Sequence, residues 1–214
     1  MENKLSLSIQ QQIKQGISIL KQGGIVAFPT DTVYGLGACI SIRQAVERVY
    51  QIKQRPSSMA LPLLLADASQ IGEVASTVPQ IAWLLADKFL PGALTLVLLR
   101  SKSVPNIITG GGKTVAVRIP DHPVPIALAQ GLGTPIVGTS ANLSGKPTAS
   151  TADEVYAQLG NKVDLIIDGG RCPGGKESTI VDLTGETPMV LREGAISREE
   201  LEQVCPSIAL TKGG

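Results

Sequence analysis

The chain has 214 residues, of which 43% are hydrophobic and 17% charged, with a formal net charge of +1. This length allows one well-filled core or at most two small lobes, and the composition excludes a disordered chain. Nineteen basic against eighteen acidic residues argue against a general electrostatic attraction to nucleic acid and leave only a local basic cleft open. With 3% aromatic residues, the core must consist of small aliphatic side chains, which suits strands buried beneath helices.

The sequence predicts a soluble, cytoplasmic protein without a membrane partner. Cys39, Cys172 and Cys205 are far apart and form no CxxC pair, so we expect reduced structural thiols rather than a disulfide framework or a zinc site. The first fifteen residues lack an apolar core of signal-peptide length. The longest apolar stretches, at 61–66 and 93–99, are too short to span a bilayer.

Hydrophobic periodicity predicts the elements of the first half of the chain. Ile9, Ile13, Ile17 and Leu20 share one helical face, and Gly23 ends that helix. The elements expected next are a strand at 25–28, a polar turn at 29–37, a helix at about 42–53 with Ser41 as N-cap, a strand at 61–66, and short helices around 68–75 and 78–89.

The second half continues the alternation of strands and helices. We expect strands at 93–99, 114–120, 135–140 and 163–168, helices at about 124–130 and at 152–159, and two strands in STIVDL and PMVLRE. Ser150 or Thr151 caps the 152–159 helix, and Ser197 with Glu200 forms a capping box for a last helix. The pattern predicts one α/β domain over 9–205, with a twisted, mixed parallel and antiparallel sheet flanked by helices. Residues 206–214 are expected to form a partly frayed tail.

Familiar catalytic motifs are incomplete. GGGKT at 110–114 resembles the end of a phosphate-binding P-loop, but Ile107 stands where the first glycine is required, and a strand follows instead of a helix. A dinucleotide fingerprint and a GxSxG nucleophile elbow are also missing. The single histidine, His122, cannot support a multi-histidine metal site, so a structural or surface role is the better interpretation.

Four polar segments remain: PTDTVYGLG, KQRP, GTSANLSG and GGKEST. Hydroxyl groups and exposed backbone N–H groups at strand ends can bind anionic oxygens, and Lys53 and Arg55 add a point charge and a planar fork suited to phosphate. Arg118 and Arg192 lie on largely buried strands, where a cation needs an anionic partner. Taken singly, each segment also fits a solvated helix end, a tight turn or a loop. Together they predict a site for a phosphorylated nucleotide.

These motifs, in this order, resemble those of the YrdC-like threonylcarbamoyl-AMP synthases. PTDTVYGLG, KxRP at 53–56, VRIP at 117–120, TSANxSG at 139–145, STIVD and LREG carry the resemblance. It covers residues 16 to 197. It implies a single α/β domain of YrdC-like fold around a large, positively lined cavity.

The resemblance also implies site residues. The family's Lys–Arg–Ser–Asn tetrad falls on Lys53, Arg55, Ser140 and Asn142, and its completeness favours the synthase over a related branch that lacks the Ser–Asn pair. The positions implied for threonine are Thr32, Arg118, Gly138 and Ser178, with Arg118 holding the carboxylate. The positions implied for ATP are the tetrad, Thr114 and Arg192.

The implied reaction converts L-threonine, bicarbonate and ATP into threonylcarbamoyl-AMP and diphosphate. In the family, a tRNA threonylcarbamoyl-transferase complex then uses the product to make t6A next to the anticodon. The chemistry needs positioning and electrostatic stabilisation by Lys53, Arg55 and Mg²⁺, and it needs no protein nucleophile. The metal ligands and a general base stay unassigned.

One position departs from the family pattern, and the length also differs. Many relatives carry a histidine shortly after KxRP, where this chain has Leu64. Longer relatives carry a C-terminal domain, so this chain resembles the short, single-domain form. Two rival functions are an RNA-binding module, including contact with tRNA or double-stranded RNA, and carbamoyl transfer. Few stacking aromatics and balanced charge disfavour RNA binding as the main role, and carbamoyl transfer uses additional domains.

Overall fold

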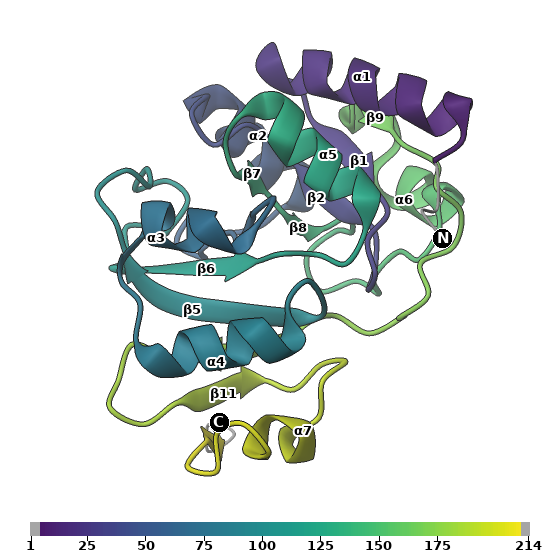
Figure 1. Ribbon diagram of the computed structural model, residues 1–214. Coiled ribbons are helices and arrows are strands. Elements are labelled where there is room, and N and C mark those ends of the chain that lie inside the picture. Colours follow the sequence, from purple (N-terminus) through teal and green to yellow (C-terminus); the bar gives the residue numbers. More distant parts are fainter. Residues whose placement is uncertain (1–4, 211–214) are drawn as a thin grey trace.

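The computed structural model describes residues 5–210 (Figure 1). Helices and strands alternate along most of this length, as the sequence predicts. The α-helices are α1 (Leu7–Lys21), α2 (Arg43–Lys53), α3 (Ile71–Val74), α4 (Gln80–Phe89), α5 (Pro123–Leu132), α6 (Ala152–Leu159) and α7 (Arg198–Glu202). Short 3-10 helices at Ala68–Gln70 and Gly160–Lys162 precede α3 and follow α6.

The strands form two mixed sheets. They are β1 (Val26–Phe28), β2 (Gly35–Gly37), β3 (Leu63–Leu64), β4 (Ala75–Thr77), β5 (Leu94–Arg100), β6 (Thr114–Arg118), β7 (Ile136–Val137), β8 (Thr139–Ser140), β9 (Leu165–Ile166), β10 (Thr179–Asp182), β11 (Met189–Arg192) and β12 (Ala209–Leu210). The small sheet has the order β8-β2-β1-β9, and the large sheet has the order β12-β11-β10-β5-β6-β3-β7, with β4 paired to β5. The predicted mixture of parallel and antiparallel strands is confirmed, and a bridge between Cys39 and Ile136 links the two sheets.

Helix α1 forms as its sequence predicts. The Ser6 side chain accepts a hydrogen bond from the Ile9 backbone N–H at the start of the helix, and Gly23 adopts a positive φ of 82° after its end. The predicted apolar face is confirmed, because Ile13 and Leu20 are buried in a cluster shared with α5 and β1. In Figure 1, α1 and α5 therefore lie together over the small sheet.

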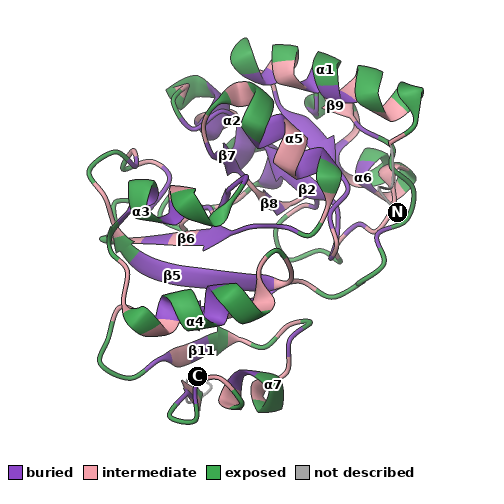
Figure 2. Ribbon diagram, viewed as in Figure 1, coloured by how far each residue is buried: buried purple, intermediate pink, exposed green. Residues whose placement is uncertain are grey.

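The large sheet has one face in the core and one face toward a cavity. Leu94, Leu96 and Leu98 of β5 are completely buried in the main hydrophobic cluster, to which α4 contributes its inner side. The alternate residues Thr95 and Val97 line the cavity instead. In Figure 2, β1, β5 and most of β6 are buried, whereas the outer sides of α1 and α4 are exposed.

The segment predicted as one strand at 135–140 is two strands, so that prediction is wrong at its centre. β7 pairs with β3 in the large sheet, whereas β8 pairs with β2 in the small sheet. Gly138 lies between them, and its N–H donates to the carbonyl of Pro62 at 2.9 Å. Where the chain changes sheets it passes close to Leu64, since a Cβ at position 138 would lie 2.1 Å from Cγ of Leu64. Only glycine allows this approach.

The predicted helix caps have mixed outcomes. Thr151 caps α6, and the Ser197–Glu200 capping box of α7 is confirmed. The prediction of Ser41 as N-cap of α2 is wrong, because the helix starts one residue later, after Ile42, without a side-chain cap. The Ser41 hydroxyl instead lies 3.1 Å from the sulfur of Cys39.

Further expectations concern the thiols, the membrane and the C-terminus. The three cysteines are buried and free, as expected. Within residues 5–210, no helix has both the length and the apolar character needed to cross a bilayer. Of the expected tail at 206–214, Ile208 is buried and Ala209–Leu210 pairs with β11, while 211–214 lie outside the described residues.

The close approach at Gly138 gives a prediction. Gly138→Ala should lower the free energy of unfolding by about 1–3 kcal/mol, the usual cost of overpacking, because the new methyl group would overlap the Leu64 side chain. The double variant with Leu64→Ala should lose less stability than the sum of the two single variants, as measured by urea unfolding. Strictly additive losses would show that the two side chains do not compete for this space.

Candidate functional site

One cavity of about 340 Å³ gathers most of the predicted site residues. It lies over the face of the large sheet formed by β5, β6, β10 and β11, and it reaches the turn after β1 and strand β8. Its volume is at the lower end of the range for small-molecule sites. The predicted residues that line it are Thr32, Arg55, Thr114, Arg118, Gly138, Ser140, Ser178 and Arg192.

Lys53 and Asn142 do not line the cavity but lie directly behind Ser140. Lys53 is only 2% exposed, which excludes the solvated helix end as an explanation. Its ammonium donates to the backbone carbonyl of Ser140, to that of Asn142 at 2.8 Å and to Asn142 Oδ1 at 3.2 Å. Burial, helped by repulsion from Arg55, lowers the pKa of Lys53 to about 8. The three oxygens favour the charged form and oppose that shift.

Arg55 follows the end of α2, where Gln54 adopts a left-handed conformation with φ 51°. Its Nη2 donates to the carbonyl of Ala60 at 2.9 Å and its Nε to that of Met59 at 3.5 Å, which leaves both N–H groups of Nη1 and one of Nη2 without a protein acceptor in the described structure. Burial lowers the pKa of Arg55, but a guanidinium stays charged at any physiological pH. Arg55 thus presents an uncompensated positive charge to the cavity.

Arg118 is held by three acceptors at the inner end of the cavity. Its Nη2 lies 2.6 Å from Oδ1 of Asp31, Nη1 donates to Thr32 Oγ1 at 2.9 Å, and Nε donates to the carbonyl of Gly92 at 2.9 Å. The sequence predicted that this buried cation needs an anion, and Asp31 provides it. Of the five N–H donors of a guanidinium, one on each terminal nitrogen remains. These two can bind a carboxylate in a bidentate manner.

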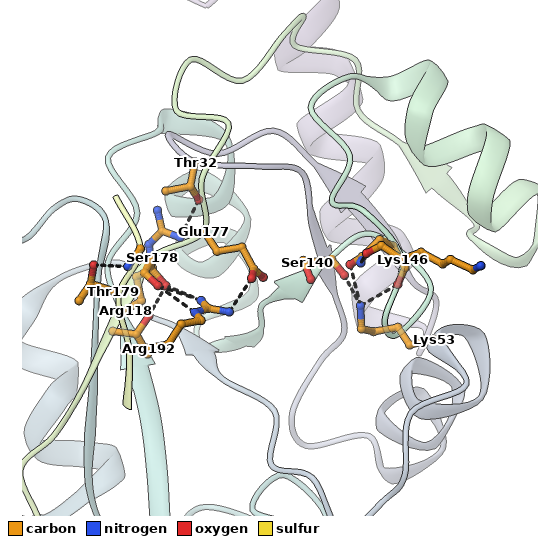
Figure 3. Close-up of polar contacts among 12 residues, drawn as sticks. Thr32, Lys53, Arg118, Ser140, Lys146, Glu177, Ser178, Thr179 and Arg192 are labelled. Atoms are coloured by element: carbon orange, nitrogen blue, oxygen red, sulfur yellow. Dashed lines mark hydrogen bonds and ion pairs between the residues drawn. The ribbon is translucent and has the colours of Figure 1, made fainter. Parts of the chain in front are cut away.

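Ser178 and Arg192 form a second group on β10 and β11. The hydroxyl groups of Ser178 and Thr95 are 2.7 Å apart, and Arg192 donates to the Ser178 carbonyl at 2.9 Å. Nη1 of Arg192 lies 2.6 Å from Oε2 of Glu177, the anionic partner expected for this second strand arginine. Figure 3 shows this group on one side of the view and the contacts of Lys53 with the Ser140 loop on the other.

The glycine-rich loop before β6 is a structural feature. Gly110 has a φ of 59°, and a Cβ there would lie 2.3 Å from the carbonyl oxygen of Ser58. The loop therefore packs against the segment that follows Arg55. It leads into a strand, so the rejection of a P-loop is confirmed, while Thr114 at the start of β6 still reaches the cavity.

His122 has the structural role that the sequence favoured. Its Nδ1 accepts a hydrogen bond from the Val124 N–H and caps α5. Burial lowers the pKa of His122, which favours the neutral ring that this bond requires. Leu64, the residue that departs from the family pattern, lines the cavity, so the wall is apolar at that point.

Sequence reasoning missed Asp31 and Glu177 as members of the site. Both lie within segments that it singled out, PTDTVYGLG and GGKEST. The signal available was the requirement of Arg118 and Arg192 for anions, but eighteen acidic residues offered no way to choose between them. The assembled site has three arginines and one lysine against these two carboxylates. Such a cavity is suited to a ligand that carries negative charge.

The fold and site define an α/β protein with a cationic cavity, and comparison with known proteins gives its family. The Sua5/YciO/YrdC family model, described as "Telomere recombination", matches residues 18–194. Because this is well over half of the chain, the protein belongs to that family.

Named relatives have similar sequences. The chain is 42% identical over 199 residues to a threonylcarbamoyl-AMP synthase of Pyrococcus abyssi, covering 93% of this chain and 58% of the relative. It is 41% identical over 203 residues to a threonylcarbamoyl-AMP synthase of Bacillus subtilis, covering 94% of this chain and 59% of the relative. The chain therefore spans less than two thirds of the length of these two relatives. The uncharacterized protein YciO of Escherichia coli is 37% identical over 187 residues, covering 86% and 90%.

Solved structures confirm the fold. The crystal structure of P. abyssi Sua5 complexed with L-threonine matches with a TM-score of 0.91 at 42% identity, covering 93% of this chain and 58% of that one. E. coli YciO matches with a TM-score of 0.82 at 35% identity, covering 90% and 93%. The predicted YrdC-like fold is thus confirmed.

The buried pair of Arg118 and Asp31 gives a prediction on stability. Asp31→Asn should lower the free energy of unfolding by about 3 kcal/mol, because it leaves a buried guanidinium without its counter-ion. Glu47→Gln, which breaks an exposed pair with Arg43, is the matched control and should cost less than about 0.5 kcal/mol. Chemical denaturation of both variants provides the measurement. A similarly small decrease in the free energy of unfolding of both variants would show that Asp31 does not stabilise the buried Arg118.

The lowered pKa of Lys53 gives a prediction on pH. The folded-state pKa of about 8 lies below the ordinary value of 10.5, so between pH 8 and pH 10 the unfolded chain binds more protons. Stability should therefore rise with pH in this window, by at most about 1.4 kcal/mol per pH unit. Lys53→Met should lack this contribution when unfolding is compared at pH 7.5, 8.5 and 9.5. Identical pH slopes for the two proteins would show that Lys53 stays charged.

Proposed function

We propose that this chain is an L-threonylcarbamoyladenylate synthase, and therefore a nucleotidyltransferase. The observation that supports the proposal best is the meeting of two sets of residues in one cavity. Thr32, Arg118 and Ser178, expected to bind threonine, line the same space as Arg55, Ser140 and Arg192, expected to bind ATP. The sequence similarity to named threonylcarbamoyl-AMP synthases points to the same reaction.

The proposed reaction begins with the amino group of L-threonine. That nitrogen attacks the carbon of bicarbonate, water leaves, and a carbamate forms. A carbamate oxygen then attacks the α-phosphorus of ATP, the bond from this phosphorus to the bridging oxygen of the β-phosphate breaks, and diphosphate leaves. The two free N–H donors of Arg118 suit the threonine carboxylate, while the hydroxyl groups of Thr32 and Ser178 are available to its side chain.

Charge stabilisation is the main task left to the protein in this reaction. Negative charge grows on the phosphate oxygens and on the leaving diphosphate. Arg55, with N–H groups unused by the protein, can bind these oxygens without displacing a carboxylate. Lys53 lies behind the cavity wall and orients the Ser140 carbonyl and the Asn142 amide. It therefore positions the nucleotide wall, by which we mean the side of the cavity formed by Arg55, Ser140 and Arg192. The apolar wall at Leu64 offers no proton acceptor in place of the family's histidine.

Mg²⁺ fits the site only as a companion of the phosphates. The described residues contain no cluster of three or more His, Cys, Asp or Glu side chains that could hold a metal ion. Glu177 is the one carboxylate among the cavity-lining residues of the described chain, and Mg²⁺ is commonly bound by one or two carboxylates, phosphates and water. Bound there, Mg²⁺ would neutralise charge on the phosphate oxygens.

Passing the product to a tRNA threonylcarbamoyl-transferase complex for t6A formation is part of the proposal, as is a cytoplasmic location. Contact with tRNA or double-stranded RNA stays a prediction.

The proposed function predicts diphosphate release that depends on threonine. Purified protein incubated with ATP, bicarbonate and one amino acid at a time should release diphosphate with L-threonine only, and the release should require bicarbonate. Arg55→Met should lower this rate at least about 100-fold, the usual effect of losing one charge-stabilising donor. Arg43→Met, at the other end of α2 and with its side chain 75% exposed, should leave the rate unchanged.

Release of diphosphate without threonine, or with all amino acids alike, would overturn the assignment. Equal rates of diphosphate release for the Arg55 and Arg43 variants would show that Arg55 does not stabilise charge in the reaction.

A further inference from the structure

Glu177 is the only acidic residue that lines the cavity within the described chain, and apart from the Mg²⁺ contact considered above it has no role in the proposed chemistry. Its carboxylate contacts Arg192 at 2.6 Å, and the side chains of Glu177 and Arg192 are 35% and 38% exposed. An ion pair with this exposure contributes little to stability. A contribution to the stability of the fold therefore does not explain why residue 177 is a carboxylate.

The backbone fixes both partners in place. Ile180 of β10 pairs with Arg192 of β11, and the carbonyl of Glu177 accepts a hydrogen bond from the Ala195 N–H at 2.9 Å. Gly194 allows this contact, because a Cβ there would lie 2.2 Å from the Glu177 carbonyl oxygen. Arg192 also donates twice to the Ser178 carbonyl. Its remaining nitrogen, Nη1, is the one that contacts Glu177.

The negative charge of Glu177 also acts on the other cations of the nucleotide wall. Burial is the main cause that lowers the pKa of Lys53 and of Arg55, and Glu177 opposes this shift at both residues. Arg118 has its own counter-ion, Asp31. In Figure 3, the Glu177 side chain extends from the Arg192 group toward Ser140. Glu177 thus pairs directly with Arg192 alone, but its charge also acts on Lys53 and Arg55.

We infer that Glu177 competes with the substrate's phosphate groups for Arg192. Its carboxylate is paired with Arg192 in the empty cavity and is displaced when a phosphate ligand binds. The inference rests on the proposed function only in requiring that a phosphate ligand enters this cavity. A carboxylate here weakens the binding of every anion at Arg192, including the diphosphate product. The carboxylate thereby favours product release, because a site with three cations that lack a carboxylate partner would retain a product with several negative charges.

The position of the ion pair suits this role. Glu177 and Arg192 line the cavity and also a second pocket of about 360 Å³, which Lys176 and Glu193 line as well. The pair therefore lies at the wall shared by the two spaces. Lys176 adds a further cation to the lining of the second pocket.

Calorimetric titration with inorganic diphosphate, without and with Mg²⁺, tests the inference on the full chain. Glu177→Gln keeps the shape and a hydrogen-bond acceptor for Arg192 but removes the charge. It should bind diphosphate about five- to tenfold more tightly than the unchanged protein. Glu193→Gln is the matched control, because Glu193 lines the second pocket but not the cavity. Its affinity should change less than twofold.

Several outcomes would overturn the inference. Equal affinities, or no diphosphate binding by any of the proteins, would show that Glu177 does not compete. Weaker binding by Glu177→Gln, above all with Mg²⁺, would make Glu177 a ligand of the metal–diphosphate complex. Glu177→Ala should also bind more tightly, and it provides a second test should the Gln variant be unstable.

The threonine-dependent release assay separates this inference from the proposed function. Absence of release together with tighter diphosphate binding by Glu177→Gln would reject the synthase and support the competitor. Normal release together with equal affinities would reject the competitor alone.

Discussion

The buried ammonium group of Lys53 is the contact on which the nucleotide side of the cavity depends. It joins the end of α2 to the loop after β8 through three oxygens of Ser140 and Asn142, and the carbonyl of Lys53 itself accepts from the Ser144 N–H at 2.9 Å. Because Arg55 lies two residues beyond Lys53, the same contact sets the position of Arg55 relative to Ser140. A neutral side chain could not satisfy these three acceptors, which explains why a costly buried charge is present here.

Charge balance organises the rest of the site. The deeply buried arginine, Arg118, has a close carboxylate in Asp31, because an unpaired guanidinium would be too costly there. The more exposed Arg192 has Glu177, and a pair with that exposure can exchange its anion for another at small cost. Arg55 has no carboxylate partner among the described residues. The arginines therefore differ in how firmly they are paired. Arg118, held by Asp31, suits a substrate carboxylate, whereas Arg192 and Arg55 are free to bind phosphates.

The two halves of the site come from different sheets, and the switch at Gly138 brings them together. Ser140 belongs to the small sheet and Arg118 to the large one. The turn after β1 joins them, because Thr32 accepts a hydrogen bond from Arg118 and the Tyr34 carbonyl accepts one from the Ala141 N–H. Tyr34 also donates its hydroxyl hydrogen to the Gly170 carbonyl at 2.8 Å. This contact links the turn that carries Thr32 to the segment that leads to Ser178. Both expected substrate sites thus depend on contacts between segments more than 80 residues apart.

The sequence by itself determined the local elements and the chemical inventory. Apolar periodicity located α1 and β5, short-range hydrogen bonding located the caps at Thr151 and Ser197, and ordered motifs indicated the family and eight of the residues that line the cavity. The tertiary structure decided that the chain passes from one sheet to the other at Gly138. It also decided which carboxylates pair with Arg118 and Arg192, and that Lys53 lies behind the cavity wall. These features could not be predicted because strand pairing and ion pairing join residues distant in sequence, and many acidic residues satisfy a cation equally well until folding brings one within reach.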